Sequence, residues 1–260
     1  MPTITLTTDL GLKDYYVASV KGAILKDNPS VNIIDISHEV PAFNMQVCAF
    51  IIRNCYQDFP EGTIHIIGIN SDVDIETPHV VVFANGHYFI GADNGIFSLI
   101  LDSPPEKVFE LTVSQDTDSI TFPTKDVFVK AACHLARGGT MEVIGKQKNE
   151  LNARSMFRAV SENNVIKGMA IYIDHYGNIV TNITQRLFKE FGKGRKFKIL
   201  FRSAEYEIDT ISPSYNAVVE GERVAMFSST GNIEIAINKA NASKLFGIHQ
   251  GDIIRVEFYD

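Results

Sequence analysis

The chain has 260 residues, of which 45% are hydrophobic and 21% charged, and its formal net charge is −7. This composition is typical of a globular protein with one large or two ordinary domains, and it excludes a disordered chain. The negative charge excludes nucleic acid as the expected partner, because binding a phosphate backbone needs a basic surface. The sequence shows neither a secretory signal nor a membrane span, so we expect a cytoplasmic location and no membrane partner.

The first half of the chain alternates strand-like and helix-like segments, as α/β domains do. Strands are predicted at Thr3–Thr7, Val31–Ile36 and Thr63–Ile69, and helices at Asp14–Lys26 and Met45–Tyr56. The strands are β-branched or apolar runs, whereas the helices repeat apolar residues at spacings of three and four. The order β-α-β-α-β predicts parallel pairing of these strands.

A hairpin and a further helix are predicted next. Val80–Phe83 and Tyr88–Ile90 flank Asn85-Gly86, the dipeptide that favours a tight hairpin turn. The helix covers Asp126–Arg137 and ends at Gly138-Gly139, where a left-handed cap is expected. We therefore predict an α/β domain with a mainly parallel sheet over residues 1–155.

The second half changes to short strands separated by turns. They are predicted at Val165–Ile173, Ile179–Ile183, Phe197–Phe201, Ala204–Ile208, Arg223–Phe227, Ile233–Ile237 and Ile253–Phe258. This spacing predicts a small all-β barrel or sandwich over residues 164–260. The domain boundary is expected in the polar stretch Lys146–Asn164.

The cysteines and histidines show no pattern of a metal site. Cys48, Cys55 and Cys133 lie in apolar or amphipathic segments without C-x-x-C spacing, so we expect reduced core thiols, no metal and no bound cofactor. We expect most of the histidines without a motif to be surface or edge residues: His65, His79, His87, His134 and His249.

Asp9 and Asp14 bracket the loop after the first strand. Ligands of open α/β sheets bind at the carboxyl ends of strands, where a carboxylate can accept both hydroxyls of a ribose. A structural alternative exists for each residue: Asp14 can cap the first helix, and Asp9 can support the turn through its own backbone.

Two loops of the second half carry polar groups, Asp174–Asn178 and Ser228–Gly231. A carboxylate can bind an ammonium group, a hydroxyl can bind a carboxylate, and the Asn178 amide can read an adenine edge. Because Gly, Asn, Asp and Ser also dominate ordinary turns, each loop alone is better explained as a turn.

The order of these motifs resembles a known family, the enzymes that cleave S-adenosylmethionine at C5′: the hydroxide adenosyltransferases with the related fluorinase and chlorinase. The similar segments are Thr7–Gly11 with Asp14, Asp35–His38 with Pro41–Phe43, Ala92–Gly95, Asp174–Asn178 with Thr181-Asn182, and Ser229–Gly231 with Glu234–Asn238. The resemblance covers essentially the whole chain.

The resemblance implies a role for each matching residue. Asp9 would hold the ribose hydroxyls, Phe43 would pack near the sugar and thioether, Asp14 and Asp174 would bind the methionine ammonium, Ser229 its carboxylate, and Asn178 the adenine with Tyr176 beside it. It also implies a homotrimer with the ligand between the first domain of one subunit and the second domain of its neighbour.

The catalytic positions of the hydrolytic branch are changed here. An Asp, an Arg and a His of that branch correspond to Asn70, Thr77 and Pro123, and Thr124 falls where the halogenating branch has a serine beside the halide. Asn70 cannot act as a base. Asp72 or Asp74 could replace it if the loop turned them inward, although solvated loop acids are the simpler interpretation.

Two functions therefore stay open, with Asn70 and Thr124 as the candidate catalytic residues. One is cleavage of S-adenosylmethionine by water, giving adenosine and methionine, or by another nucleophile. The other is an S-adenosylmethionine or adenosine-binding protein that has lost the reaction. An unrelated α/β metabolite enzyme is a third possibility, because fold does not imply function.

Overall fold

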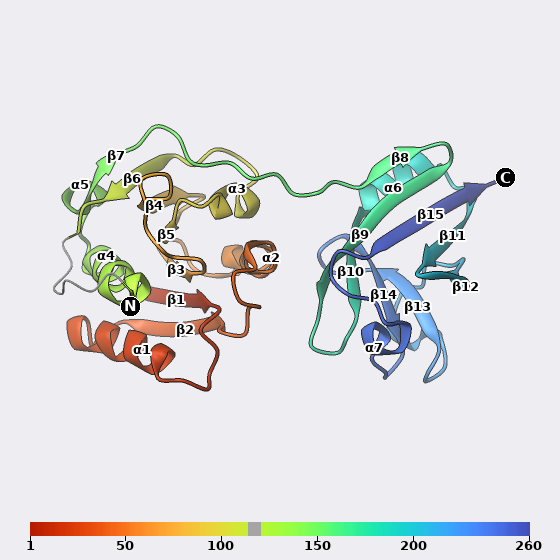
Figure 1. Cartoon of the computed structure of the whole chain (residues 1–260), viewed down its shortest axis with the longest axis horizontal. Helices are drawn as coiled ribbons and strands as arrows, with labels where there is room; N and C mark the ends of the chain where they lie inside the picture. The colour runs from red at the N-terminus through yellow and green to blue at the C-terminus, as the bar shows by residue number, and fades with distance from the viewer. Residues whose placement is uncertain (114–120) are drawn as a thin grey trace. The chain divides into compact units, whose positions relative to one another are not determined.

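The chain divides into two compact units in the computed structural model, which describes residues 1–113 and 121–260. The first unit covers Met1–Met156 and the second Phe157–Asp260 (Figure 1). Each unit has its own sheet and its own buried core.

The sheet of the first unit has seven strands in the order β2, β1, β3, β5, β4, β6, β7. They are β1 (Thr3–Thr8), β2 (Asn32–Ser37), β3 (Ile64–Gly68), β4 (His79–Ala84), β5 (His87–Ala92), β6 (Lys107–Leu111) and β7 (Gly145–Gln147). Strands β2, β1, β3 and β5 pair in parallel, whereas β4 and β7 run against the others. The sheet is thus mixed and mostly parallel, and the predicted α/β class is confirmed in that form.

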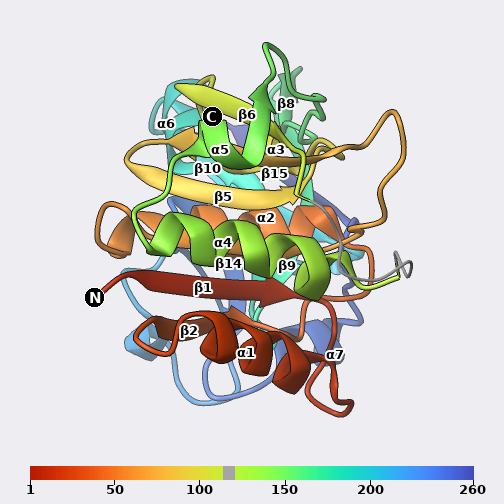
Figure 2. The same cartoon turned by 90° about the vertical axis from the view of Figure 1, so that its left-hand side faces the viewer.

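Short helices cover both faces of this sheet. They are α1 (Tyr16–Asp27), α2 (Met45–Arg53), α3 (Ile96–Ile100), α4 (Val129–Ala136) and α5 (Met141–Ile144). Figures 1 and 2 show α1 and α4 on one face and α2 and α3 on the other. In the ranges that the structure describes, no helix is both long and apolar enough to cross a membrane.

The helix boundaries differ from the predicted ones. The first helix begins at Tyr16 rather than Asp14, because residues 12–15 form bends. The second ends at Arg53, and a separate 3-10 turn covers Tyr56–Asp58. The last begins with a π-helical turn, Thr124–Phe128. Strands β6 and β7 and helices α3 and α5 were not predicted, because runs of 3 to 5 residues show no clear periodicity.

The predicted hairpin is confirmed between β4 and β5. Asn85 and Gly86 have φ angles of 51° and 79°, the left-handed pair that a type I′ turn needs. The antiparallel register runs from His79 opposite Ala92 to Ala84 opposite His87.

The second unit is a nearly closed antiparallel barrel. Its strands are β8 (Val160–Glu162), β9 (Val165–Ile173), β10 (Ile179–Thr184), β11 (Lys196–Phe201), β12 (Ser203–Ile208), β13 (Arg223–Phe227), β14 (Asn232–Ile237) and β15 (Ile253–Tyr259). The order is β12, β11, β15, β9, β10, β14, β13, with β8 added to β9. Ile211, just after β12, bridges Ala225 of β13 and brings the two edges together.

The prediction of an all-β second domain is wrong in one respect, since the unit also contains α6 (Gln185–Gly192) and α7 (Ala242–Phe246). Side-chain caps begin both helices. Thr184 Oγ1 accepts from the Leu187 N–H at 3.2 Å, and Asn241 Oδ1 accepts from the Lys244 N–H at 2.8 Å. The short β8 also lies inside the stretch that was predicted to be a linker.

The three cysteines are free, as predicted. Cys48 and Cys133 are buried, and Cys55 is partly buried. Burial raises the pKa of the Cys55 thiol to about 11, so it stays protonated at neutral pH.

The prediction that most of these histidines are surface or edge residues is wrong, because His65, His79 and His87 are all buried. Their sequence neighbours are apolar strand residues, so the rings point into the α/β core. The ring Nδ1 of His65 lies 2.7 Å from Thr5 Oγ1, and its Nε2 lies 3.2 Å from His87 Nδ1. Burial and then the charge of His87 lower the pKa of His65 from 6.5 to about 3.

We expect the free energy of unfolding to decrease as the pH is lowered from 6.5 toward 3. In that window only the unfolded chain protonates His65. One such group costs about 1.4 kcal/mol per pH unit. His79 and His87, whose pKa values burial also lowers, add to the loss. Urea unfolding between about pH 5 and 7 should show a flatter pH dependence for His65→Gln, while the exposed control His249→Gln keeps the wild-type slope. Equal slopes for His65→Gln and wild type would contradict this expectation.

Candidate functional site

Asp9 joins two loops at the carboxyl end of β1. Its Oδ2 accepts a 2.8 Å hydrogen bond from the backbone N–H of Phe43, in the loop after β2. The Gly11 N–H also donates to the His38 carbonyl at 2.8 Å, so the loops are joined twice. Asp9 therefore does more than support its own turn. A carboxylate has about four acceptor positions, so Asp9 retains capacity for a diol.

Phe43 is held in a conformation that bulky residues avoid. Its φ is 62°, in the left-handed region, and its side chain is 72% exposed. The next residue, Asn44, caps α2 by accepting from the Val47 N–H at 3.1 Å. A strained, exposed aromatic residue bonded to a carboxylate is a feature that binding sites show and ordinary loops rarely do.

Asp14 takes no part in the hydrogen bond between Asp9 and Phe43. It is exposed, and Tyr15 rather than Asp14 is the N-cap residue of α1, without a side-chain cap bond. The capping alternative for Asp14 is therefore wrong. Its exposed carboxylate follows the same loop as Asp9.

The segment Asp35–His38 supports the site through a contact with the residue before Asp9. His38 is buried, and its Nδ1 lies 2.7 Å from Thr8 Oγ1, next to Asp9. The Lys21 ammonium donates to Asp35 Oδ2. Burial alone would raise the pKa of Asp35, but Lys21 and His38 outweigh it and lower that pKa.

The segment Ala92–Gly95 fixes the loop after β3. Asn94 donates from Nδ2 to the carbonyls of Ile69, at 3.3 Å, and Asn70, at 3.0 Å. The fully buried Asp93 accepts from Lys148 Nζ at 2.8 Å and from the Asn152 N–H at 2.9 Å. This motif therefore positions Asn70, a support role that the sequence did not reveal.

The structure describes the residues that the resemblance aligns with the catalytic Asp, Arg and His. Asn70 is exposed and left-handed, with φ of 45°. Asp74 Oδ1 accepts from the backbone N–H groups of Glu76, at 2.8 Å, and Thr77, at 2.6 Å. The bonds from Thr77 are the main cause of the lowered pKa of Asp74. Asp74 thus stabilises its own turn and is a weakened base, while Asp72 is exposed.

Thr124 lies in the π-helical turn that follows Pro123, next to the carboxyl end of β3. It is buried, and a Cβ built on Gly68, the last residue of β3, would lie 2.7 Å from its Oγ1. Thr8 Cγ2 is also next to Gly68. Thr124 therefore lies near the carboxyl ends of β1 and β3.

In the second unit, Asp174 and Asn178 form one hydrogen-bonded turn between β9 and β10. Asp174 Oδ1 accepts from the Asn178 N–H at 2.8 Å, and Oδ2 accepts from Asn178 Nδ2 at 2.9 Å. Gly177 is left-handed, and a Cβ there would lie 2.2 Å from the Asn241 side chain. Tyr176 is 74% exposed beside the buried Asn178. The turn interpretation is thus correct, and the remaining acceptor capacity of Asp174 and Asn178 is compatible with binding.

Ser229 is exposed in the loop between β13 and β14. Its neighbours fix that loop: the Gly231 N–H donates to the Ser228 carbonyl at 2.9 Å, and Ser228 Oγ lies 2.8 Å from Thr230 Oγ1. Since β10 and β14 are antiparallel, this loop and the Asp174 turn lie at opposite ends of their pair. A ligand that contacts both must extend along these two strands.

Two further residues, to which the sequence analysis gave no role, meet at β14. Glu234 of β14 is 5% exposed, and its Oε1 accepts a 2.5 Å hydrogen bond from the Tyr215 hydroxyl. The available signal for Glu234 was a charge inside an otherwise apolar strand, Asn232–Ile237. Tyr215 lies in a short 3-10 turn and carried no sequence signal.

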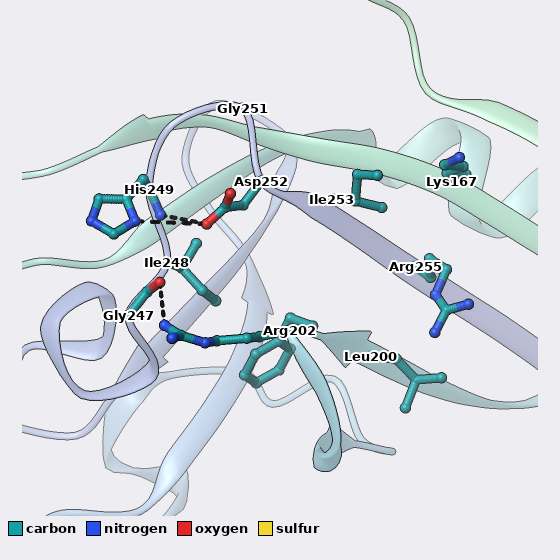
Figure 3. Close-up of a pocket in the computed structure, with 11 residues that line it drawn as sticks. Lys167, Leu200, Arg202, Gly247, Ile248, His249, Gly251, Asp252, Ile253 and Arg255 are labelled. Carbon is teal, nitrogen blue, oxygen red and sulfur yellow. Dashed lines mark hydrogen bonds and ion pairs between the residues drawn. The ribbon is translucent and has the colours of Figure 1, made fainter.

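Two surface cavities lie elsewhere. One of about 830 Å³ in the second unit has a basic rim with Lys167, Arg202 and Arg255 (Figure 3). Arg202 is engaged there with the carbonyls of Phe246 and Gly247, at the end of α7. The other, of about 560 Å³, is in the first unit. Neither is lined by a predicted site residue. Over residues 1–113 and 121–260, no three His, Cys, Asp or Glu side chains form a metal-ligand group.

Comparisons with known proteins agree with this geometry. Residues 4–145 match the SAM hydroxide adenosyltransferase N-terminal domain, and residues 168–255 match the C-terminal domain, SAM being S-adenosylmethionine. The chain is 27% identical to an (R)-S-adenosyl-L-methionine hydrolase of Thermus thermophilus, with 98% of this chain and all of that protein covered. It is 24% identical to a fluorinase of Actinopolyspora mzabensis, with 98% and 97% covered. A solved structure of an uncharacterized conserved protein from Thermotoga maritima has a TM-score of 0.88 at 28% identity, with 97% of this chain and 99% of that chain covered.

Proposed function

Because this chain belongs to the S-adenosylmethionine hydroxide adenosyltransferase family, we propose that it binds S-adenosylmethionine and cleaves it at C5′. The observation that carries the proposal is the hydrogen bond between Asp9 and Phe43, two residues to which the family resemblance gives neighbouring roles. Relatives named as hydrolases and as a fluorinase support the proposal that the bond to C5′ is the one broken.

In this proposal each residue meets a chemical group of the ligand. Asp9 accepts both ribose hydroxyls, and the exposed ring of Phe43 covers the sugar and thioether. Asn178 and Tyr176 hold the adenine, Asp14 and Asp174 the ammonium, and Ser229 the carboxylate. Carboxylates suit a diol and an ammonium because charge-assisted hydrogen bonds are about twice as strong as neutral ones.

The reaction is displacement at carbon. A nucleophile forms a bond to C5′, the bond from C5′ to the sulfonium breaks, and its electron pair leaves with methionine. With water as nucleophile, the product is adenosine and one proton must be removed. Alignment in a dry pocket supplies much of the acceleration, but water also needs a base, and the altered positions provide none. Thr124 is the candidate to orient the nucleophile, since its hydroxyl lies at the strand ends.

The second candidate is a ligand-binding protein with little or no turnover. The substitution of Asn70, Thr77 and Pro123 for the expected Asp, Arg and His favours it. Slow hydrolysis and attack by an anionic nucleophile in place of water are both compatible with the same pocket. We also propose a cytoplasmic protein that takes small molecules rather than nucleic acid or membranes as partners, and that needs no cofactor or metal.

Asp9→Ala and Asp174→Ala should each weaken binding of S-adenosylmethionine about tenfold to hundredfold, the value of roughly 1.5–3 kcal/mol for a charge-assisted bond. Calorimetric titration measures the affinities. Asp209→Ala, an exposed acid in another loop of the second unit, is the matched control and should bind like wild type. Absence of binding to the unchanged protein would refute the proposed function.

Hydrolysis by the wild-type protein should be slow, and Asn70→Asp with Thr77→Arg and Pro123→His should raise it. Asn70→Asp alone should change little, because catalytic groups that act as a unit are strongly non-additive. Chromatography of adenosine measures the rate. Since Pro123 is buried, circular dichroism must show that the triple variant is folded. A folded triple variant no faster than wild type would show that these positions do not limit the reaction.

We further propose a homotrimer in which Asp9 of one subunit and Asp174 of the next serve one ligand. A ring of identical heterologous contacts buries the same two patches at every interface. Light scattering gives the mass. Co-refolding Asp9→Ala with Asp174→Ala chains should restore tight binding at roughly a quarter of the interfaces, those where both intact carboxylates meet. A mixture that binds no better than either variant alone would contradict the sharing.

A further inference from the structure

Glu234 is a buried carboxyl group on the outer face of the barrel. Its neighbours Ile233, Ile235 and Ile237 belong to the barrel core, so the alternation of β14 turns Glu234 and Ala236 outward. A small apolar cluster that includes Met226 and Ala236 covers this face, and Glu234 is only 5% exposed. An acid is an unfavourable residue at such a position unless something compensates its charge.

The surroundings of Glu234 are acidic or neutral. The Tyr215 hydroxyl donates to it, and no Lys, Arg or His in the part of the chain that the structure describes forms an ion pair with it. Burial and then the charge of Asp174 raise the pKa of Glu234, against the lowering effect of Tyr215. Burial and the same Asp174 charge raise the pKa of Tyr172, which pairs with Val180 of β10 as Glu234 does from the other side. The group formed by Glu234, Asp174 and the two tyrosines therefore favours binding of a cation.

The position of Glu234 matches one part of the proposed ligand. Asp174, the proposed ammonium ligand, precedes the end of the β10 and β14 pair at which Ile179 faces Ile235. Glu234 is the outward residue next to Ile235 on β14, opposite Val180 of β10, so its carboxyl group lies close to that end.

Resting on the proposed function, we propose that Glu234 is the second carboxylate of the ammonium subsite, protonated when the site is empty and ionised when an ammonium group binds beside Asp174. The proton leaves the carboxyl group for solvent, and the resulting carboxylate pairs with the ammonium. Tyr215 positions this carboxylate through its hydroxyl. Binding of an aminoacyl nucleoside thus releases a proton, whereas binding of a nucleoside without an ammonium group does not.

The test uses S-adenosylhomocysteine, which keeps the ammonium but lacks the reactive sulfonium, with adenosine as the matched ligand. Calorimetric titrations between about pH 5 and 8, in two buffers of different ionisation enthalpy, give affinity and proton release. Wild type should bind S-adenosylhomocysteine up to tenfold more tightly per pH unit through the pKa of Glu234, with release of up to one proton. Adenosine binding should show neither effect.

Two variants separate this role from a structural one. Glu234→Gln keeps an acceptor for Tyr215, and should lose the pH dependence and the proton release while binding adenosine normally. Tyr215→Phe removes a donor that lowers the pKa of Glu234, so its pH midpoint should move upward. Equal pH dependence and proton release in Glu234→Gln and wild type would overturn the inference alone. No binding of S-adenosylhomocysteine to wild type at any pH would overturn the proposed function and this inference with it.

Discussion

The hydrogen bond between the Phe43 N–H and the Asp9 carboxylate is the contact on which the loops of the first unit depend. Strands β1 and β2 are parallel neighbours, so their carboxyl ends meet, and this bond joins the loops that leave them. A left-handed Phe costs about 1–3 kcal/mol, and a bond to a charged acceptor returns about 1.5–3 kcal/mol. Because the two magnitudes are similar, the exposed ring keeps its position only while Asp9 holds its backbone.

The same loops limit the chemistry that the first unit can perform. Asp74 is an acid of the loop that contains Thr77, but its carboxylate is used by its own turn, which lowers its basicity. Asn94 donates a hydrogen bond to the backbone carbonyl of Asn70 and not to its side chain. The side-chain amide of Asn70 therefore stays exposed. An amide can orient a water molecule but cannot remove its proton. In the proposed reaction, these loops therefore suit a nucleophile that arrives as an anion better than neutral water.

The strong local patterns of the sequence predicted much of the fold. Asn85-Gly86 fixed one hairpin because only left-handed residues complete its turn, and the alternating apolar segments located both sheets. The short β6 and β7 carry no period, and α6 and α7 begin at caps that also read as turns. The site loops were found through their order along the chain. The bond from Asp9 to Phe43 joins residues 34 positions apart, and that of Tyr215 to Glu234 joins residues 19 apart, so local pattern could not reveal either.

Glu234 shows how an inconsistent residue can indicate function. The other residues of β14 follow the usual burial pattern of a strand. Its isoleucines pack in the barrel core, and Ala236 packs in the outer apolar cluster. An apolar residue in place of Glu234 would fit this face at no electrostatic cost, whereas a buried carboxyl must be neutralised by a proton or a cation. Tyr215 supplies a single hydrogen bond, and Asp174 adds repulsion rather than relief. In the proposed binding mode a proton neutralises this carboxyl group in the empty site, and a cationic ligand takes over that role when it binds.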